Sequence, residues 1–419
     1  MNNKEHNVLV LDPMYSNLSN NICNVFNGKK YVIPSLYAFY IYLPSCRFFR
    51  VKRTNKPSFE MLKLVVKNKN LYCDTIYKKS NRNLSKDEII YFAQYAEFVS
   101  DFIERKNINI ILVHNDTRWN HSLVIDIAKK NKIPVIVTEL GLIRPNTTVV
   151  DFMGCNANSR IKNKESWDIE SKYIPVTKDK VKFNHENLFS RFIFLFFLIL
   201  VKMELCFFRR KHKKYIHNDY SIFKYVITLY KLKCYNKKNG KIEFVKKSNK
   251  INVFLVLQLE HDSQFIVHSD VIKNQDLITY FERVCEENDR QLIIKSHPLD
   301  IKSLKIKSTT QVAYSCVKKI SREVDYVFTV NSSAALLVLE TTTPLYLLGD
   351  SIFAHDKVAE KISLNDINEI ISKNEPQQNI SQRENFLNYI KNNYLLYGAG
   401  FSYDKVNIRQ KLNQIMDIV

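Results

Sequence analysis

The chain has 419 residues, and at about 100 to 200 residues per domain this length favours two substantial domains over one. Hydrophobic residues make up 45% and charged residues 25%, which excludes a disordered or fibrous protein. The formal net charge of +21 indicates anionic partners, such as phosphates, acidic lipids or a negatively charged substrate, and does not by itself select nucleic acid.

The cysteines and the apolar runs bear on the compartment. The cysteines are scattered without a C-x-x-C pair or a closely spaced histidine, which disfavours a zinc site and a disulfide framework. Asp12 and Pro13 interrupt the first apolar stretch too early for a signal peptide, so we expect a cytoplasmic protein with reduced thiols. The strongest apolar run, residues 192–201, is shorter than the roughly 20 residues that span a bilayer and predicts a buried or interfacial helix.

The first half of the chain has the pattern of a parallel α/β domain. Residues 7–12 are typical of a buried strand, and the Tyr- and Phe-rich stretch after them shows no readable period. A helical period at 87–106 is followed by an apolar strand at 108–114, a helix at 121–132 and a strand at 133–140. Strand, helix and strand at this spacing predict a right-handed unit of a doubly wound sheet.

The second half repeats this pattern after a basic and aromatic region at about 160–250, which we interpret as helices and an interdomain connection. The expected elements are a strand at 251–260, a helix at 274–287, a strand at 291–298, a short strand at 311–314, and a strand, turn, helix and strand at 324–350. We therefore predict an α/β chain of the GT-B type, with two Rossmann-like lobes facing across a cleft. The expected limits are an N-terminal lobe at 1–185, a helical connection at 186–250, a C-terminal lobe at 251–385 and a helical tail at 386–419.

Polar residues follow several of these strands, where open parallel sheets bind their ligands. Residues 331–333, Asn-Ser-Ser, precede an apolar helix and either cap it or cradle a phosphate. Lys295 and His297 end another strand, and Pro298 holds His297 in an extended turn. A turn histidine is usually structural, but the shared sheet edge favours a ligand role. The absence of a P-loop and of G-x-G-x-x-G disfavours an ATPase or a standard dinucleotide site.

Carboxylates follow one strand in each lobe. Glu260 and Asp262 come after the first strand of the second lobe, as solvated turn residues or as candidates for nucleophilic or acid/base chemistry. Because residues two apart on an extended strand end point the same way, geometry does not choose between them. Glu139 ends a strand of the first lobe and is followed by Gly141 and Arg144, so it either pairs with Arg144 or serves the same chemistry.

Several blocks of the sequence fall in the order typical of one family. They are NDTRWNH (115–121), ELGLIRPNTTVVDFMGCNANS (139–159), QLEHDSQ (258–264), IKSHPLD (294–300), TVNSSAALLVLETTTPLYLLGDSIF (329–353) and LLYGAGFSYD (395–404). In these blocks the chain resembles the capsular polysaccharide β-Kdo transferases of Gram-negative bacteria, particularly the single-module KpsS-like type. The glycine-rich N-terminal segment and the N-F-N-G-G-D run of that family are not recognisable between residues 12 and 60, which leaves the acceptor open.

The resemblance implies a retaining glycosyltransferase that moves Kdo from CMP-Kdo to a lipid acceptor, phosphatidylglycerol or Kdo-phosphatidylglycerol. It would act at the inner face of the cytoplasmic membrane, with other capsule assembly proteins as candidate partners and with neither metal nor cofactor. It makes Asp262 the nucleophile and Glu139 the acid/base partner. The donor-binding residues implied are Gln258, Gln264, Lys295, His297, Pro298, Asn331, Ser332 and Ser333, and the sugar-side residues are Asp116, Arg118, His121 and Arg144.

Other functions remain open from the sequence. A transferase for a related CMP-sugar, such as a sialic-acid-like nonulosonate, would share the fold and the nucleotide site. A non-catalytic protein associated with capsule export is a second alternative. A nucleic-acid binder is disfavoured, because no helix-turn-helix, zinc or RNA-binding signature is present. We also expect peripheral membrane binding through residues 192–208 and the basic run 209–214.

Overall fold

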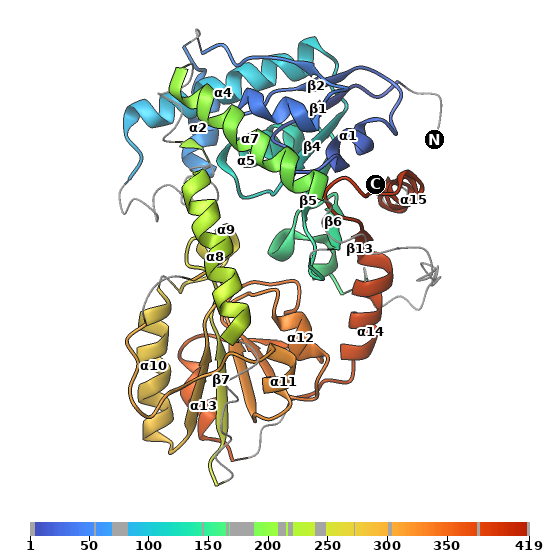
Figure 1. Cartoon of the computed structure of the whole chain (residues 1–419). Coiled ribbons are helices and arrows are strands. Elements are labelled where there is room, and N and C mark those ends of the chain that lie inside the picture. Colours follow the sequence, from blue (N-terminus) through green and yellow to red (C-terminus); the bar gives the residue numbers. More distant parts are fainter. Residues whose placement is uncertain are drawn as a thin grey trace. The chain divides into compact units, whose positions relative to one another are not determined.

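The computed structural model describes residues 5–53, 56–68, 83–144, 146–164, 167, 188–207, 215–216, 221–238, 249–271, 273–300, 304–374 and 378–416 (Figure 1). The chain forms two compact units. The first contains Met1–Cys155, Tyr173–Ile222 and Asn392–Val419, and the second contains Asn156–Lys172 and Phe223–Lys391.

The first unit is built on a seven-stranded sheet in the order β13-β6-β5-β4-β1-β2-β3. The strands are β1 Val8–Val10, β2 Lys30–Val32, β3 Arg47–Phe48, β4 Ile110–His114, β5 Val135–Leu140, β6 Thr147–Asp151 and β13 Leu395–Tyr397. β1 to β5 are parallel, and β6 pairs antiparallel with both β5 and β13. β4 is buried at every position, which explains its continuous apolar run, because a parallel sheet is covered on both faces.

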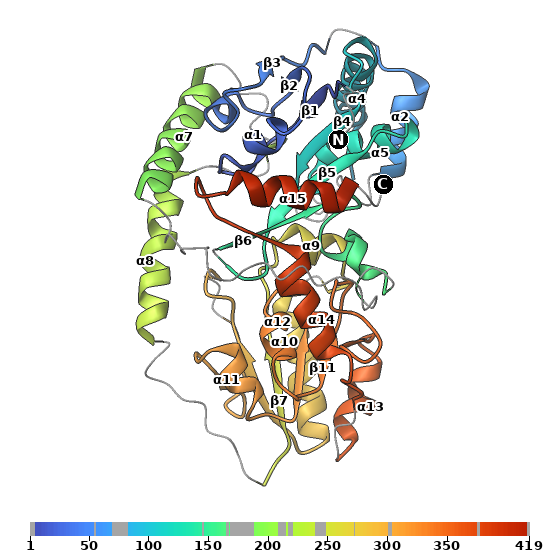
Figure 2. The same cartoon turned by 90° about the vertical axis from the view of Figure 1, so that its right-hand side faces the viewer.

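Helices cover this sheet. They are α1 Leu18–Cys23, the 3₁₀ helix η1 Tyr37–Tyr42, α2 Phe59–Asn68, α4 Lys86–Arg105, α5 Trp119–Lys130, α7 Leu188–Phe207 and α15 Lys405–Met416. α4 begins at a capping box in which Ser85 and Glu88 each bind the other's backbone N–H. α15 lies beside α1, with Ile408 and Leu412 in the same apolar cluster as Leu18 (Figure 2).

The second unit is built on a six-stranded sheet in which every neighbouring pair is parallel. Its strands are β7 Asn252–Val256, β8 Gln291–Lys295, β9 Gln311–Val312, β10 Tyr326–Thr329, β11 Leu345–Leu347 and β12 Glu360–Lys361, in the order β12-β11-β10-β7-β8-β9. Numbered along the chain within the unit and read from β9 to β12, this order is 3-2-1-4-5-6, the Rossmann order. Its helices are α8 Ile222–Lys238, α9 Ser263–Val267, α10 Asn274–Glu287, α11 Val317–Ser321, α12 Ala335–Leu339, α13 Asp366–Ser372 and α14 Arg383–Tyr389, followed by the π-helix η7 Ile390–Tyr394.

The predicted fold class, an α/β chain of the GT-B type with two Rossmann-like lobes, is confirmed by these sheets. The limits of the units differ from those expected. The stretch 386–419 is not wholly helical, because its apolar residues Leu395 to Tyr397 pair with β6 as an edge strand of the first sheet. Residues 156–172 join the second unit. α7 belongs to the first unit, and Phe197 is buried there against Phe39 and Tyr42.

Candidate functional site

The carboxyl ends of three adjacent strands carry the polar residues of the first unit. Asp12 follows β1, Asn115 and Asp116 follow β4, and Glu139 lies near the end of β5. Asp12, Asn115 and Asp116 are buried and Glu139 is half-buried. Because β1, β4 and β5 are neighbours in the sheet, the fold brings these side chains to one edge.

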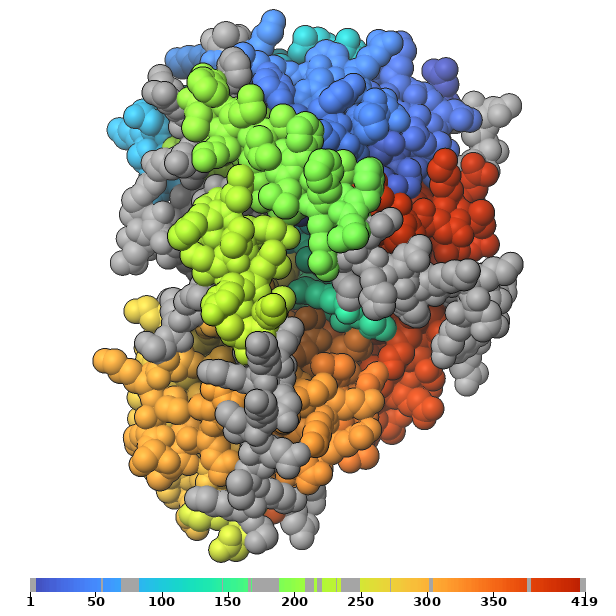
Figure 3. Space-filling view, viewed as in Figure 1, coloured from blue at the N-terminus to red at the C-terminus, as the bar shows by residue number. Residues whose placement is uncertain are grey.

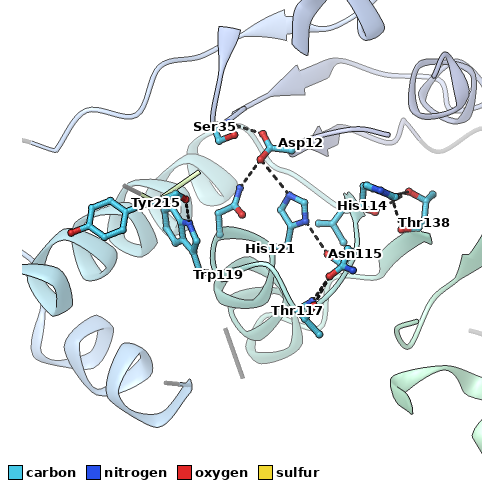
Figure 4. Close-up of polar contacts among 11 residues, drawn as sticks. Asp12, Ser35, His114, Asn115, Thr117, Trp119, His121, Thr138 and Tyr215 are labelled. Atoms are coloured by element: carbon cyan, nitrogen blue, oxygen red, sulfur yellow. Dashed lines mark hydrogen bonds and ion pairs between the residues drawn. The ribbon is translucent and has the colours of Figure 1, made fainter. Parts of the chain in front are cut away.

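Asp12 lies in a buried polar network that the sequence analysis did not include in the site. Its Oδ1 accepts a 2.6 Å hydrogen bond from Ser35 N, and its Oδ2 accepts one of 3.1 Å from Asn120 Nδ2 (Figure 4). His121 Nε2 lies 3.9 Å from the same Oδ2. The sequence feature that could have identified Asp12 is its position directly after the first apolar run.

Asn115 connects the residues of this edge. It has a φ of 70°, a left-handed conformation that asparagine adopts more easily than most residues. Its Oδ1 accepts hydrogen bonds from both the N–H and the hydroxyl of Thr117, at 2.8 and 2.6 Å. Its Nδ2 donates to Glu139 Oε2 at 2.6 Å. Asn115 thereby fixes the orientation of the Glu139 carboxylate.

His121 is fully buried and neutral. Its Nδ1 is 2.9 Å from the carbonyl oxygen of Asn115, and a carbonyl only accepts, so Nδ1 carries the proton. Burial lowers the pKa of His121 to about 4, against the opposing effect of Asp12. Nε2 therefore presents a lone pair, and among the described residues it has no hydrogen-bond partner.

The remaining predicted residues of this unit differ in placement. Asp116 is held by Cys155, whose N–H and thiol each lie 3.0 Å from one carboxylate oxygen. Burial raises the pKa of the Cys155 thiol, which keeps it a donor. Arg118 is buried and precedes α5. Arg144 is exposed, and its Nε donates to the Gly141 carbonyl at 3.4 Å. The Cys155 thiol also lies 4.0 Å from Glu139 Oε2, which connects Asp116 to Glu139, and Asn115 connects Glu139 to His121. Arg144 lies on the loop outside this network.

In the second unit, residues after β7 and β10 form a buried amide cluster. The backbone N–H of Asn331 is 3.4 Å from Gln258 Oε1, and Asn331 Nδ2 donates to the backbone carbonyl of Gln264 at 2.9 Å. Asn274 Nδ2 donates to the carbonyl of Gln258 at 2.8 Å. Within the described part of the chain, Asn331 Oδ1 is buried without a donor. The structure therefore brings Gln258, Gln264 and Asn331 together, and their role as donor-binding residues stays a prediction.

Lys295 is the last residue of β8, which lies beside β7 in the sheet. Its Nζ donates to the Tyr314 carbonyl at 3.0 Å, and burial lowers its pKa to about 8. His297 lies two residues further on, before Pro298, and its Nδ1 accepts from Leu299 N at 3.1 Å. An ammonium of reduced hydration at this edge is suited to binding a phosphate.

Ser332 and Ser333 lie in the turn after β10. Ser332 Oγ accepts a 3.2 Å hydrogen bond from Ala334 N, and α12 begins only at Ala335. α12 has five residues, so it is much shorter than the helix that the apolar sequence predicts. Ser332 is buried and Ser333 half-buried.

Glu260 and Asp262 do not lie on an extended strand end, as the sequence analysis expected. β7 ends at Val256, and the two carboxylates instead serve the starts of two helices. Asp262 is the N-cap of α9, with its Oδ1 accepting from Gln264 N at 2.9 Å. Glu260 Oε1 accepts from Asn274 N at 2.7 Å, at the start of α10. Local geometry thus separates the two carboxylates and gives each a structural contact.

Among the described residues, no group of three or more His, Cys, Asp or Glu side chains is placed to hold a metal ion. In the same part of the chain, every helix is too short or too polar to cross a membrane.

Residues 109–398 match the model of a family described as capsule polysaccharide biosynthesis protein. A search of curated proteins finds no match. Among solved structures, the chain is similar to the Thermosulfurimonas dismutans KpsC beta Kdo 2,4 transferase, with 12% identity, a TM-score of 0.39, and coverage of 73% of this chain and 88% of that chain.

Two other solved structures are similar at the same level. The beta Kdo 2,7 transferase of Thermosulfurimonas dismutans KpsC has 14% identity, a TM-score of 0.35, and coverage of 83% of this chain and 95% of that chain. The UDP-GlcNAc 2-epimerase of Methanocaldococcus jannaschii has 12% identity, a TM-score of 0.33, and coverage of 99% and 100%. These identities and TM-scores carry no argument about activity.

Proposed function

The chain belongs to the capsule polysaccharide biosynthesis protein family, and from this premise we propose that it is a retaining glycosyltransferase that moves Kdo from CMP-Kdo to a lipid acceptor. Phosphatidylglycerol and Kdo-phosphatidylglycerol are the acceptors proposed, at the cytoplasmic face of the membrane. One observation carries the proposal. Family-like blocks far apart in the sequence supply the buried polar residues at the carboxyl edges of both sheets, where α/β folds bind ligands.

In the proposed reaction, the Asp262 carboxylate attacks the anomeric carbon of Kdo, and the bond to the CMP phosphate breaks with its electron pair on the phosphate oxygen. Lys295 and Ser332 stabilise the charge of the departing phosphate. Glu139 then takes the proton of the acceptor hydroxyl, whose oxygen displaces Asp262 from the sugar. Two inversions give net retention. No step of the proposed reaction involves a metal or a cofactor.

The direct test is to incubate the purified chain with CMP-Kdo and a fluorescent phosphatidylglycerol analogue, and to determine the mass and anomeric configuration of the product. A Kdo product with retained configuration is expected. Transfer from a CMP-nonulosonate but not from CMP-Kdo would favour the related-sugar alternative. If the chain neither transfers nor hydrolyses either donor, the non-catalytic alternative replaces the proposal.

The proposed contact of Lys295 with phosphate predicts a pH dependence of CMP binding. Lys295 is charged below its pKa of about 8 and neutral above it, whereas a phosphate monoester is fully charged from about pH 7 upward. CMP affinity is therefore expected to be constant near pH 7 and to fall as pH rises through 8. Calorimetry between pH 7 and 9.5 measures this. Lys295→Met should bind about 10- to 150-fold more weakly at pH 7 and lose the dependence; an unchanged profile contradicts the assignment.

The turn after β10 is proposed to bind the same phosphate through its hydroxyls. We expect the Ser332→Ala, Ser333→Ala double variant to bind CMP at least tenfold more weakly, since a hydrogen bond to a charged group contributes about 1.5 to 3 kcal/mol. Calorimetry with CMP is the measurement, and thermal unfolding verifies the fold. Ser363→Ala, in an exposed loop of the same unit, is the matched control. Wild-type affinity in the folded double variant would remove the turn from the nucleotide site.

Helix α7 is proposed to bind the membrane surface. One face packs against η1, where the Glu204 carboxylate accepts from the backbone N–H groups of Tyr37 and Ala38. The other face is apolar and exposed, including Phe192 at 69% and Phe207 at 74%, and α7 lies on the surface of its unit (Figure 3). An apolar face of this kind is typical of interfacial helices. The basic run 209–214, predicted to attract anionic lipid, lies outside the described residues.

Liposome flotation tests this proposal. The Phe192→Ser, Phe207→Ser double variant is expected to partition at least tenfold less onto anionic vesicles, because burying each phenyl ring contributes about 1.5 to 3 kcal/mol. Phe59→Ser, at an 81% exposed position on α2, is the matched control and should bind normally. Vesicle binding by the wild-type chain is expected to weaken as salt is added, and replacing Arg209, Arg210 and Lys211 together by Ala should remove this salt dependence. Flotation that persists in both variants would contradict the proposal.

A further inference from the structure

A pocket of about 330 Å³ opens next to the Asp12 network in the first unit, and nothing in the proposed mechanism uses it. Ser35 and Asn120, which bind the two oxygens of Asp12, form part of its lining. The pocket therefore shares a wall with the buried edge of the sheet. Arg50, Arg53, Tyr91, Tyr95, Trp119 and Tyr215 also line it. Its volume lies at the small end of ligand sites, which suits one sugar unit or head group.

The lining combines cations with aromatic rings. Arg50 and Arg53 both line the pocket, and no acidic side chain does so among the described residues. The guanidinium carbon of Arg53 lies 3.9 Å from the centroid of the Tyr91 ring, so its planar group is oriented by stacking. Tyr91 and Tyr215 pack with centroids 4.7 Å apart (Figure 4 shows Tyr215 beside Trp119). Guanidinium groups bind carboxylate or phosphate, and flat aromatic rings pack against apolar surfaces such as those of a sugar.

Tyr95 supplies an independent sign of a ligand. The residue is only 4% exposed, and within the described part of the chain its hydroxyl has no hydrogen-bond partner. Burial raises the pKa of Tyr95, Asp12 raises it further, and Arg53 lowers it. A buried hydroxyl without a hydrogen-bond partner is destabilising, and a bound acceptor atom would offset that cost.

We infer that this pocket binds the anionic end of the acceptor, a small polyhydroxylated group bearing either a sugar carboxylate or a glycerophosphate. Arg50 and Arg53 bind the anion, Tyr95 donates to one of its oxygens, and Trp119 packs on the apolar face. Identifying this ligand as the acceptor rests on the proposed transferase function. The binding chemistry does not, because it follows from the lining alone.

The experiment measures binding to the full-length chain by calorimetry with two pairs of probes. The methyl glycoside of Kdo is compared with its uncharged methyl ester, and glycerol 3-phosphate is compared with glycerol. At least one anion is expected to bind tenfold or more tightly than its neutral partner, and the tighter anion identifies the source of the group. Equal binding of charged and neutral probes in both pairs overturns the inference.

Variants locate that binding in the pocket. Arg53→Met is expected to weaken the preferred anion at least tenfold, and Tyr95→Phe about fivefold. Tyr95→Phe removes only a hydroxyl that has no hydrogen-bond partner among the described residues, so it should fold normally. Arg105→Met, on the exposed end of α4 and outside the pocket lining, is the matched control. If both pocket variants bind like the control, the inference fails.

The transferase assay separates this inference from the proposed function. Anion binding that depends on Arg53, in a chain that transfers no sugar, would retain the pocket and reject the transferase. Active transfer with an unchanged acceptor KM in Arg53→Met and Tyr95→Phe would retain the transferase and reject the pocket.

Discussion

Asp262→Asn is expected to reduce Kdo transfer by about a thousandfold or more while CMP binding persists, because a neutral amide cannot trap the oxocarbenium-like carbon. The substitution is well suited to this position. Asp262 caps α9 through Oδ1, and asparagine caps helices as well as aspartate does. Lost activity would therefore report on the missing charge and not on a lost cap. Product formation from CMP-Kdo is the measurement, with thermal unfolding as the check on the fold.

Glu260 is the rival nucleophile, and Glu260→Gln is the matched variant. Its Oε1 accepts from Asn274 N, and a glutamine oxygen can accept in the same way. We expect Glu260→Gln to retain most of the activity. Peptide mass analysis after mixing the wild-type chain with CMP-Kdo should find the adduct on Asp262. An adduct on Glu260, or near-normal retaining turnover by Asp262→Asn, contradicts the assignment.

The central strands could be predicted because their signal is local. β4, β5, β7, β8 and β10 are apolar runs, and each lies within its predicted range, although β7 and β8 end before the predicted limits. β2, β3 and β13 have two or three residues each, too few to show a period. β13 pairs with β6 from far along the chain, so no local pattern indicates it. The sequence patterns therefore predicted both Rossmann-like lobes and the edge strand β9, and missed the edge strands β3, β12 and β13.

The site divides in the same way. Glu139 lies near the end of a recognisable strand and Asn331 follows one, both inside family-like blocks, so their places at the sheet edges could be predicted. Asp12 could not be identified as a site residue from the sequence, because its partners Ser35 and Asn120 lie 23 and 108 residues away and only the fold brings them to it. The cap made by Asp262 depends on the helix that follows it, which a strand-end argument does not include.

Glu139→Gln should separate the two halves of the reaction. The first half breaks the bond to CMP, a good leaving group that needs little acid assistance, and the second half needs a base for the acceptor proton. We expect steady-state transfer to fall by about 100- to 10,000-fold. CMP should still be released in a rapid burst of about one equivalent per enzyme, the behaviour of a trapped covalent intermediate. Rapid-quench measurement of CMP and intact-protein mass follow both events.

The structure makes this test selective for the charge of Glu139. Asn115 Nδ2 and Leu140 N donate to its two oxygens at 2.6 and 2.8 Å. Glutamine keeps one acceptor oxygen for Leu140 N but turns an amide toward the Asn115 amide, so a second variant is needed. Asn115→Ala leaves the carboxylate and removes its orienting donor; it should slow transfer less than Glu139→Gln does and accumulate less adduct. Glu104→Gln, exposed on α4, controls for loss of charge alone. If Glu139→Gln slows the CMP burst as much as the overall transfer, then Glu139 does not act as the base of the second step, and its hydrogen bonds to Asn115 and Leu140 are structural.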